Sequence, residues 1–381
     1  MSNQKNINND IELLVGGQQA FPAILDEIRA AQHSIHICMF VWRDDDIGRT
    51  IAEELFEAAD RGVKINIVKD RNGLFCEYSE EDQSSFFHKL LSPIEIFKIN
   101  IMKILYQPEL LFKPFSGKDE ELLNKIKGHP NITVDTEEYR MDHSKYYIFD
   151  EKTIIMGGIN IEDKENGADI HGTHYIDYMV KIKNEEAVQE LHEKLKNGPG
   201  NGDSLFALNV PGYKESGIIQ AYLKMIDDTS QELSIIMSYL MPIKEITDAL
   251  KRALDRGVKI RLLIPEKANY LNDSNRYTAM VLNDYANKNG YDFRIYMSEK
   301  MTHIKAMISE NTISIGSANL TGRSLWKQGE LNLFTQNDDS DFARSVKENF
   351  ETIFADSMQV KNTQQLKHSK LVVLMEKFEM S

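Results

Sequence analysis

An eight-residue segment occurs twice in the chain and limits its architecture more than any other feature. Residues 58–65 read AADRGVKI, and residues 253–260 read ALDRGVKI. In both copies a segment with helical periodicity ends at a glycine, which accepts the positive φ typical of a helix end. A short β-branched run follows and predicts a buried strand at 64–69 and at 259–264. The repeat therefore predicts a chain of two related halves.

The same order of elements extends upstream of each copy. A helix and then an apolar strand are expected within 21–42 and again within 218–239. Helices that alternate with apolar strands predict an α/β protein in which helices cover a sheet. A turn-rich stretch, NGPGNGDS at 197–204, marks the boundary between the halves. We therefore expect one domain at 1–198 and a second, similar domain at 199–381.

A second repeated pattern carries side chains suited to catalysis. The first copy is HSK at 143–145, followed by GGIN at 157–160. The second copy is HIK at 303–305, followed by GSAN at 316–319. A single His-x-Lys triplet is usually a solvated strand end, but two copies with nearly the same downstream spacing are not expected by chance. If the halves meet across a pseudo-twofold axis, the two copies form one shared pocket.

The two imidazoles of such a pocket would divide the work on a phosphodiester. One of His143 and His303 would attack phosphorus and form a covalent phosphohistidine, and the other would protonate the leaving alkoxide. The second histidine would then take a proton from the water or alcohol that displaces the enzyme. A carboxylate usually holds such a ring by its other nitrogen. Asp177 and Glu330, downstream of the two asparagines, are the candidates.

The remaining polar groups of the two copies suit the phosphate itself. Each copy offers one lysine and one asparagine to donate hydrogen bonds to the non-bridging oxygens as negative charge develops there. These residues are Lys145, Lys305, Asn160 and Asn319. Because the lysine pair supplies positive charge at the phosphate, we expect neither a metal nor another cofactor.

The repeated blocks resemble the HKD motifs of the phospholipase D superfamily, which read HxKxxxxD followed by GSxN or GGxN. The resemblance extends from about residue 11 to residue 354, and within the superfamily it is closest to bacterial cardiolipin synthases. RDDDIG at 43–48 and RSLW at 323–326 also carry it. It implies two similar α/β/α sandwich domains of the phospholipase D-like fold, related by a pseudo-twofold axis and sharing one active site.

Carried over to this sequence, the resemblance implies a role for each motif residue. His143, in the first half, is in the position of the more usual nucleophile. The acidic motif residues, Asp150 and Glu310, would be structural. Two positions depart from the family pattern, because Glu310 stands where Asp is expected and Gly158 stands where the second half has Ser317. The implied catalytic set is His143, His303, Lys145, Lys305, Asp177 and Glu330, and the implied phosphate-binding set is Asn160, Asn319, Ser317, Lys145 and Lys305.

The resemblance implies an enzyme of phospholipid metabolism. A cardiolipin synthase-like transferase would pass phosphatidyl to an alcohol such as phosphatidylglycerol, whereas a phospholipase D would release phosphatidic acid. The alternatives are a nuclease of the same superfamily and a non-catalytic protein that kept the fold. The net charge of −14 and the pI of about 5.3 disfavour a nucleic-acid partner. The sequence leaves open the acceptor, the lipid and the identity of the nucleophilic histidine.

The first half is about 35 residues longer than the second between the shared elements. The insertion covers about 74–135, and apolar residues crowd its segment 86–115, where the few charges are mainly lysines. Such a segment predicts either peripheral contact with a membrane surface or packing on the core or on a second subunit, as in a homodimer. The sequence does not separate these alternatives.

The cellular compartment follows from what the sequence lacks. Two cysteines, no signal-peptide pattern and no run of about 18 apolar residues predict a cytoplasmic protein, or one peripheral to the inner face of the cell membrane. His171 and His174 have a spacing compatible with metal binding, but no third ligand lies near them in the sequence. We interpret them as loop histidines.

Overall fold

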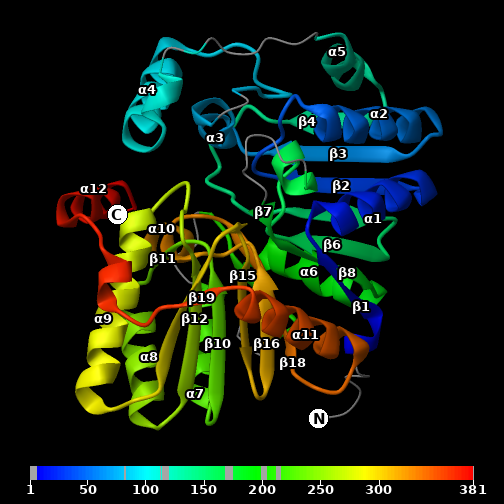
Figure 1. The fold of residues 1–381 in the computed structure, drawn as a ribbon. Coiled ribbons are helices and arrows are strands. Elements are labelled where there is room, and N and C mark those ends of the chain that lie inside the picture. The colour runs from blue at the N-terminus through cyan, green and yellow to red at the C-terminus, as the bar shows by residue number, and fades with distance from the viewer. Residues whose placement is uncertain are drawn as a thin grey trace.

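Two β-sheets, one from each half of the chain, form the framework of the protein (Figure 1). They are seen in a computed structural model that describes residues 7–80, 83–111, 113, 120–167, 175–198, 204–211 and 216–380. The first sheet has the strand order β1 (Ile11–Val15), β8 (Tyr178–Lys183), β6 (Thr153–Gly157), β5 (Tyr146–Phe149), β2 (Ser34–Met39), β3 (Lys64–Lys69) and β4 (Ile132–Asp135). The second has the order β9 (Phe206–Asn209), β18 (Glu330–Gln336), β16 (Thr312–Gly316), β15 (Lys305–Ser309), β10 (Glu232–Met237), β12 (Lys259–Pro265), β13 (Phe293–Ser298) and β19 (Met358–Gln359).

The two sheets have the same topology. In the first, β2, β3 and β4 are parallel, and β5, β6, β8 and β1 continue the sheet in antiparallel order. In the second, β10, β12 and β13 are parallel, and β15, β16, β18 and β9 are antiparallel. This correspondence confirms the prediction of two similar α/β halves. The division at 198/199 remains our proposal for the domain boundary.

Helices cover the outer face of each sheet and close the space between the sheets. Isoleucines that alternate along β2 and β3 pack against α1 (Gly17–Ala30), α2 (Asp46–Asp60) and α5 (Glu121–Gly128). The equivalent face of the second sheet packs against α7 (Gly217–Asp228), α8 (Lys244–Asp255) and α9 (Asn272–Asn289). A third apolar cluster joins the inner faces of both sheets with α6 (Glu185–Asn197) and α11 (Asp341–Ala355). The halves therefore share buried surface.

The repeated Asp-Arg-Gly segment has the same structural role in both halves. Arg61, at the end of α2, donates to the carbonyl of Ile28 at 3.0 Å, near the end of α1. Arg256, at the end of α8, donates to the carbonyl of Ile226 at 2.8 Å, near the end of α7. The glycine after each arginine has a φ of 100° or 86°, which an L side chain rarely adopts. The repeat thus fixes two neighbouring helix ends where the next strand begins.

In the sequence the insertion lies between β3 and α5, and it folds into a short helical layer. It contains α3 (Gly73–Ser79), α4 (Pro93–Tyr106) and the 3₁₀ helix η2 (Pro108–Leu110). Ser92 and Glu95 cap the start of α4 reciprocally, in the manner of a capping box. In Figure 1, α4 lies at the upper left, beside the second half rather than on the first sheet. Its last residue, Tyr106, contacts the ring of Tyr270 with centroids 4.9 Å apart.

The apolar residues of segment 86–115 do not all lie on one surface, because some are buried and others are exposed. Phe86 and Phe87 are buried against the Trp42 ring, and Ile99 is buried within the insertion. For these residues the structure therefore agrees with the alternative of packing inside the protein rather than contact with a membrane or a partner. Residues 112 and 114–119 of the segment lie outside the described residues. The exposed apolar side chains are Leu90, Ile94, Ile96, Phe97, Ile101, Ile104 and Leu105.

Short elements complete the chain. They are η1 (Ile7–Asp10), η3 (Asp163–Asn166), β7 (Tyr175–Ile176), β11 (Leu240–Met241), β14 (Met301–Thr302), β17 (Leu320–Thr321), α10 (Gly322–Trp326), η4 (Thr363–Leu366) and α12 (Lys370–Met380). Among the described residues, no helix is both long enough and apolar enough to cross a bilayer.

Candidate active site

Two short cross-connections between the halves bring the His-x-Lys motifs together. The strand β14, just before His303, pairs with β7, just before Asp177, and the His303 amide donates to the carbonyl of Ile176 at 2.7 Å. The His143 amide donates in the same way to the carbonyl of Gly329, just before Glu330, at 2.8 Å. Each histidine is therefore next to the acidic residue of the other half.

The His143 ring is held by Glu330. Its Nδ1 lies 3.2 Å from both carboxylate oxygens of that residue. Two hydroxyls fix the carboxylate from behind: Ser317 Oγ donates to Oε2 at 2.5 Å, and Ser324 Oγ donates to Oε1. With Nδ1 engaged, Nε2 is the nitrogen left for the cavity. Burial, followed by the charge of Lys145, lowers the pKa of His143 to about 4, so the ring is neutral at ordinary pH.

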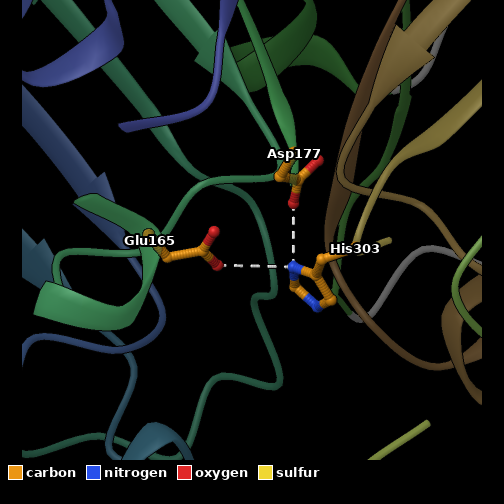
Figure 2. A group of neighbouring side chains, drawn as sticks. All are labelled: Glu165, Asp177 and His303. Carbon is orange, nitrogen blue, oxygen red and sulfur yellow. Dashed lines mark ion pairs between the residues drawn. The ribbon is translucent and has the colours of Figure 1, made fainter. Parts of the chain in front are cut away.

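Two carboxylates of the first half hold the His303 ring. Figure 2 shows Asp177 and Glu165 pointing at the same ring nitrogen, Nδ1, from different sides. The Asp177 oxygen lies 2.8 Å from Nδ1 and the Glu165 oxygen 3.4 Å. Burial raises the pKa of Asp177, but Lys305 and His303 together lower it below its ordinary value. Burial raises the pKa of Glu165 above its ordinary value, against the effect of His303.

Glu165 was missed in the sequence analysis. It lies in η3, five residues after Asn160, and its carboxyl group is buried. The residue five positions after Asn319 is Ser324, which bonds the other acid, Glu330. An alignment of the two halves beyond the asparagines would have pointed to this position, although the residue types differ.

The position of the Asp177 carboxylate requires a glycine at residue 158. A Cβ atom at Gly158 would lie 2.3 Å from an oxygen of the Asp177 carboxylate, so no side chain fits there. In the second half, the equivalent Ser317 has room for its hydroxyl and uses it on Glu330. The difference between the two motif copies at this position therefore accommodates the acid beside Gly158.

Each motif lysine bonds to the backbone of the histidine two residues before it. Lys145 Nζ donates to the carbonyl of His143 at 2.5 Å, and Lys305 Nζ donates to the carbonyl of His303. Lys305 also lies 3.3 Å from the Asp177 oxygen. Burial lowers the pKa of Lys145 to about 8 and lowers that of Lys305. Both ammonium groups are thus desolvated, which strengthens their interaction with an anion.

Asn160 and Asn319 both line the cavity and are held by their oxygens. Asn160 Oδ1 accepts from the Val41 amide at 3.3 Å, and Asn319 Oδ1 accepts from Ser238 Oγ at 3.2 Å. This leaves the amide nitrogens as donors toward the cavity, although that of Asn160 also lies 3.4 Å from Glu162.

The acidic motif residues lie away from the histidines and hold the turns before β2 and β10. Asp150 accepts from the amides of Gln32, His33 and Ser34 at 2.8–2.9 Å. Glu310 accepts from Ser230 Oγ at 2.7 Å and from the Gln231 amide at 3.2 Å. The longer Glu310 side chain makes the same kind of contact as the aspartate.

The site opens into a cavity of about 400 Å³, a size suited to a small-molecule ligand. Both halves line it, and its aromatic wall comprises Tyr175, Tyr239 and Tyr270. Lys164 also lines it and pairs with Glu80 and, at 3.3 Å, with Glu162. The helix α4 contributes Lys98, Ile101 and Met102 to the lining, and Lys98 and Ile101 are also exposed to solvent.

Glu165, Asp177 and His303 also form a cluster whose candidate ligand atoms lie within 4.8 Å of one another. The Lys305 ammonium lies 3.3 Å from the Asp177 oxygen and places a fixed positive charge beside this cluster. A cation there would be repelled by Lys305 and would compete for the nitrogen that the carboxylates hold. We therefore interpret the group as carboxylates that orient a histidine. His171 and His174 lie outside the described residues.

Sequence comparison finds relatives that are named as cardiolipin synthases. It is 25% identical over 375 residues to a probable cardiolipin synthase of Bacillus subtilis strain 168, and the match covers 91% of this chain and 66% of that protein. It is 26% identical over 377 residues to cardiolipin synthase B of Escherichia coli K12, covering 93% of this chain and 83% of that protein. The chain therefore spans about two thirds of the length of the first relative.

Structural comparison agrees on the fold. The crystal structure of a phosphatidylserine synthase of Haemophilus influenzae Rd KW20 matches with a TM-score of 0.66 and 14% identity, over 97% of this chain and 93% of that chain. A polyphosphate kinase of Porphyromonas gingivalis matches with a TM-score of 0.56 and 13% identity, over 97% of this chain and 52% of that chain. The family described as "Cardiolipin synthase, PLD-like domain" matches residues 24–197 and 222–354. The resemblance seen in the two motifs is thus confirmed, and the chain belongs to this phospholipase D-like family.

Proposed function

We propose that this protein is a phospholipid phosphatidyltransferase of the cardiolipin synthase type that works through a covalent phosphohistidine. One observation carries the proposal: His143 and His303, from different halves, line one cavity, and each ring is held by an acid of the opposite half. The names of the related cardiolipin synthases support a phosphatidyl donor.

In the first step, His143 is the nucleophile. Its Nε2 attacks phosphorus, a P–N bond forms, and the P–O bond to the leaving alcohol breaks. The low pKa of His143 keeps this nitrogen unprotonated. His303, between two carboxylates, is suited to carry a proton and gives it to the leaving alkoxide. Lys145, Lys305 and the two asparagines stabilise the charge that develops on the non-bridging oxygens.

The second step reverses the proton transfer. His303 takes a proton from the hydroxyl of an acceptor alcohol, the alkoxide attacks phosphorus, and the P–N bond to His143 breaks. With phosphatidylglycerol as both donor and acceptor, the products are cardiolipin and glycerol. With water as acceptor, the product is phosphatidic acid.

The reaction can be tested directly with purified protein and phosphatidylglycerol vesicles. We expect cardiolipin and glycerol in equal amounts by mass spectrometry, and neither product with a His143→Ala variant. Phosphatidic acid as the only product would make the protein a hydrolase. Cleavage of DNA without any lipid product would replace the proposal with the nuclease alternative.

We also propose that α4 docks the protein peripherally on the cytoplasmic face of a membrane. Its outer face exposes Ile94, Phe97 and Ile104 at 57–67% of their surface, while its inner face lines the cavity. A helix with these two faces would bring the cavity next to the bilayer that holds the lipid substrate. Burial of each such side chain would contribute about 1.5–3 kcal/mol.

The docking helix is tested by Phe97→Glu, with Met358→Glu as a control for an exposed apolar residue elsewhere. We expect Phe97→Glu to weaken sedimentation with liposomes and activity on vesicles, but not activity on a soluble short-chain phosphodiester. Equal loss on both substrates would contradict a docking role. A change of oligomeric state without a change in liposome binding would assign the face to a second copy of the chain.

A further inference from the structure

The cations of the cavity differ in whether a carboxylate neutralises them. Lys164 lines the cavity and pairs with Glu80 and Glu162. Arg323 and Lys98 also line the cavity, yet neither has a carboxylate partner among the described residues. In a chain with a net charge of −14, two unpaired cations in one cavity call for an explanation.

Pseudo-symmetry makes the contrast sharper. Lys164 lies four residues after Asn160, and Arg323 lies four residues after Asn319. The two occupy equivalent places, but within the described parts of the chain only Lys164 has a carboxylate partner. The second half therefore presents a positive charge that its counterpart in the first half does not.

Arg323 is held firmly in place. The next residue, Ser324, donates to Glu330 and accepts from the Asn319 amide at 3.0 Å, which ties α10 to the catalytic groups. The side chain of Arg323 is half-buried, and its Nε is buried without a hydrogen-bond partner in the part of the chain that is described. A desolvated donor on a charged group is costly unless a ligand pairs with it.

The charge of Arg323 reaches across the cavity to the first half. Burial raises the pKa of the Cys76 thiol to about 12, and the Arg323 guanidinium opposes part of that rise. Lys98 lies on the solvent-exposed side, on α4, with its ammonium 5.5 Å from the centre of the Phe75 ring. The two unpaired charges thus lie in different halves of the cavity wall, Arg323 on α10 and Lys98 on α4.

We propose that Arg323, assisted by Lys98, binds the phosphodiester of the acceptor alcohol while the donor phosphate occupies the histidine site. The ligand class is a glycerophospholipid with a free headgroup hydroxyl. This inference rests on the proposed transferase function, since the phosphatidyl group on His143 and the phosphodiester of the acceptor must lie in the cavity together before they are joined through glycerol. A guanidinium is suited to such an anion because it donates two hydrogen bonds at once.

The test is a competition between acceptors on a soluble short-chain phosphatidyl donor. Glycerol is the neutral acceptor, and short-chain phosphatidylglycerol is the charged one. We expect Arg323→Gln to lower the ratio of charged to neutral transfer product at least tenfold, and Arg323→Lys to retain most of it. Lys98→Gln should lower the ratio less. The matched control is Lys327→Gln, an exposed cation on the same segment, which should keep the wild-type ratio.

A ratio that stays constant in Arg323→Gln, whether or not total donor cleavage falls, would overturn the subsite, because Arg323 would then serve the reacting phosphate or the fold. A wild-type protein that makes no transfer product would instead overturn the proposed function. The subsite is then tested by calorimetry on the His143→Ala protein with short-chain phosphatidylglycerol below its micelle concentration. We expect two molecules bound per chain, and one when Arg323→Gln is added; one molecule in both proteins would overturn the subsite.

Discussion

The His143 half of the site and the His303 half follow one plan but surround their rings differently. Glu330, which holds His143, is itself held by two serine hydroxyls. Around His303, which Asp177 holds, the position equivalent to Ser317 is Gly158 and the position equivalent to Ser324 is Glu165. One ring therefore has one carboxylate with neutral support, and the other has two carboxylates.

The difference teaches how a duplicated fold can divide a two-step reaction. A neutral, desolvated ring such as His143 is suited to attack phosphorus, because its free nitrogen is unprotonated. A ring between two carboxylates is suited to hold a proton and return it. The halves need not change their topology to acquire these roles, since a few substitutions on either side of the two asparagines, at 158/317 and 165/324, are enough.

Loss of either ring should have the largest effect. We expect His143→Ala and His303→Ala each to lower turnover of phosphatidylglycerol by about 10³-fold or more, because each step needs both a nucleophile and a proton carrier. The measurement is cardiolipin formation by mass spectrometry. Activity near the wild-type level in either variant would mean that the two half-sites are not one site.

Substitution of the acids should lower the rate by different amounts in the two half-sites. We expect Glu330→Gln to lower the rate by about 10²–10³-fold, since no other carboxylate among the described residues pairs with His143, and Asp177→Asn to lower it about tenfold less. Glu165→Gln alone should have a small effect, but combined with Asp177→Asn it should reduce the rate by more than the product of the single effects. Simple multiplicativity, measured as kcat/KM, would show that Glu165 does not support His303.

The pH dependence of activity should reflect the titration of His143 and Lys145, which both belong to the first half. Activity on a soluble phosphodiester should fall as the pH drops through about 4, where His143 becomes protonated, by about tenfold per pH unit. It should also weaken as the pH rises through about 8, where Lys145 loses its charge. In Lys145→Arg, the loss near pH 8 should disappear. A loss that stays at the same pH in this variant belongs to another group.

The smallest expected effects are on stability and concern Gly158 and Ser317, which lie against the acids. Gly158→Ala should destabilise the protein by about 1–3 kcal/mol, because its Cβ would overlap the Asp177 carboxylate. Ser317→Ala should cost about 1 kcal/mol, because Glu330 loses one hydrogen bond. Urea unfolding measures both. A larger cost for Ser317→Ala would reverse the order that the two half-sites predict.

Much of this site was predictable from the sequence because it is repeated. The His-x-Lys copies and their asparagines have matching offsets, and Asp177 and Glu330 follow them at a similar distance. The exchange of acids between the halves was not predictable. It depends on the pairing of β7 with β14, which are two-residue strands without a periodic pattern.

The insertion shows a second limit. Its apolar composition predicts burial or contact, but not which residues do which. Phe86 is covered by Trp42, and Ile99 lies on the inner side of α4, whereas Phe97 on the same helix is exposed. The helical periodicity of α4 separates Phe97 from Ile99, but the location of the core relative to α4 comes only from tertiary structure.

The most direct test of the central claim is to identify the histidine that carries the covalent intermediate. A phosphatidyl substrate with a p-nitrophenyl leaving group needs no acid for departure, so His303→Ala should complete the first step and then stall. We predict one equivalent of p-nitrophenol per chain and a phosphatidyl adduct on the peptide that contains His143, found by mass spectrometry. An adduct on His303 in the His143→Ala protein, with none on His143 in His303→Ala, would contradict the account.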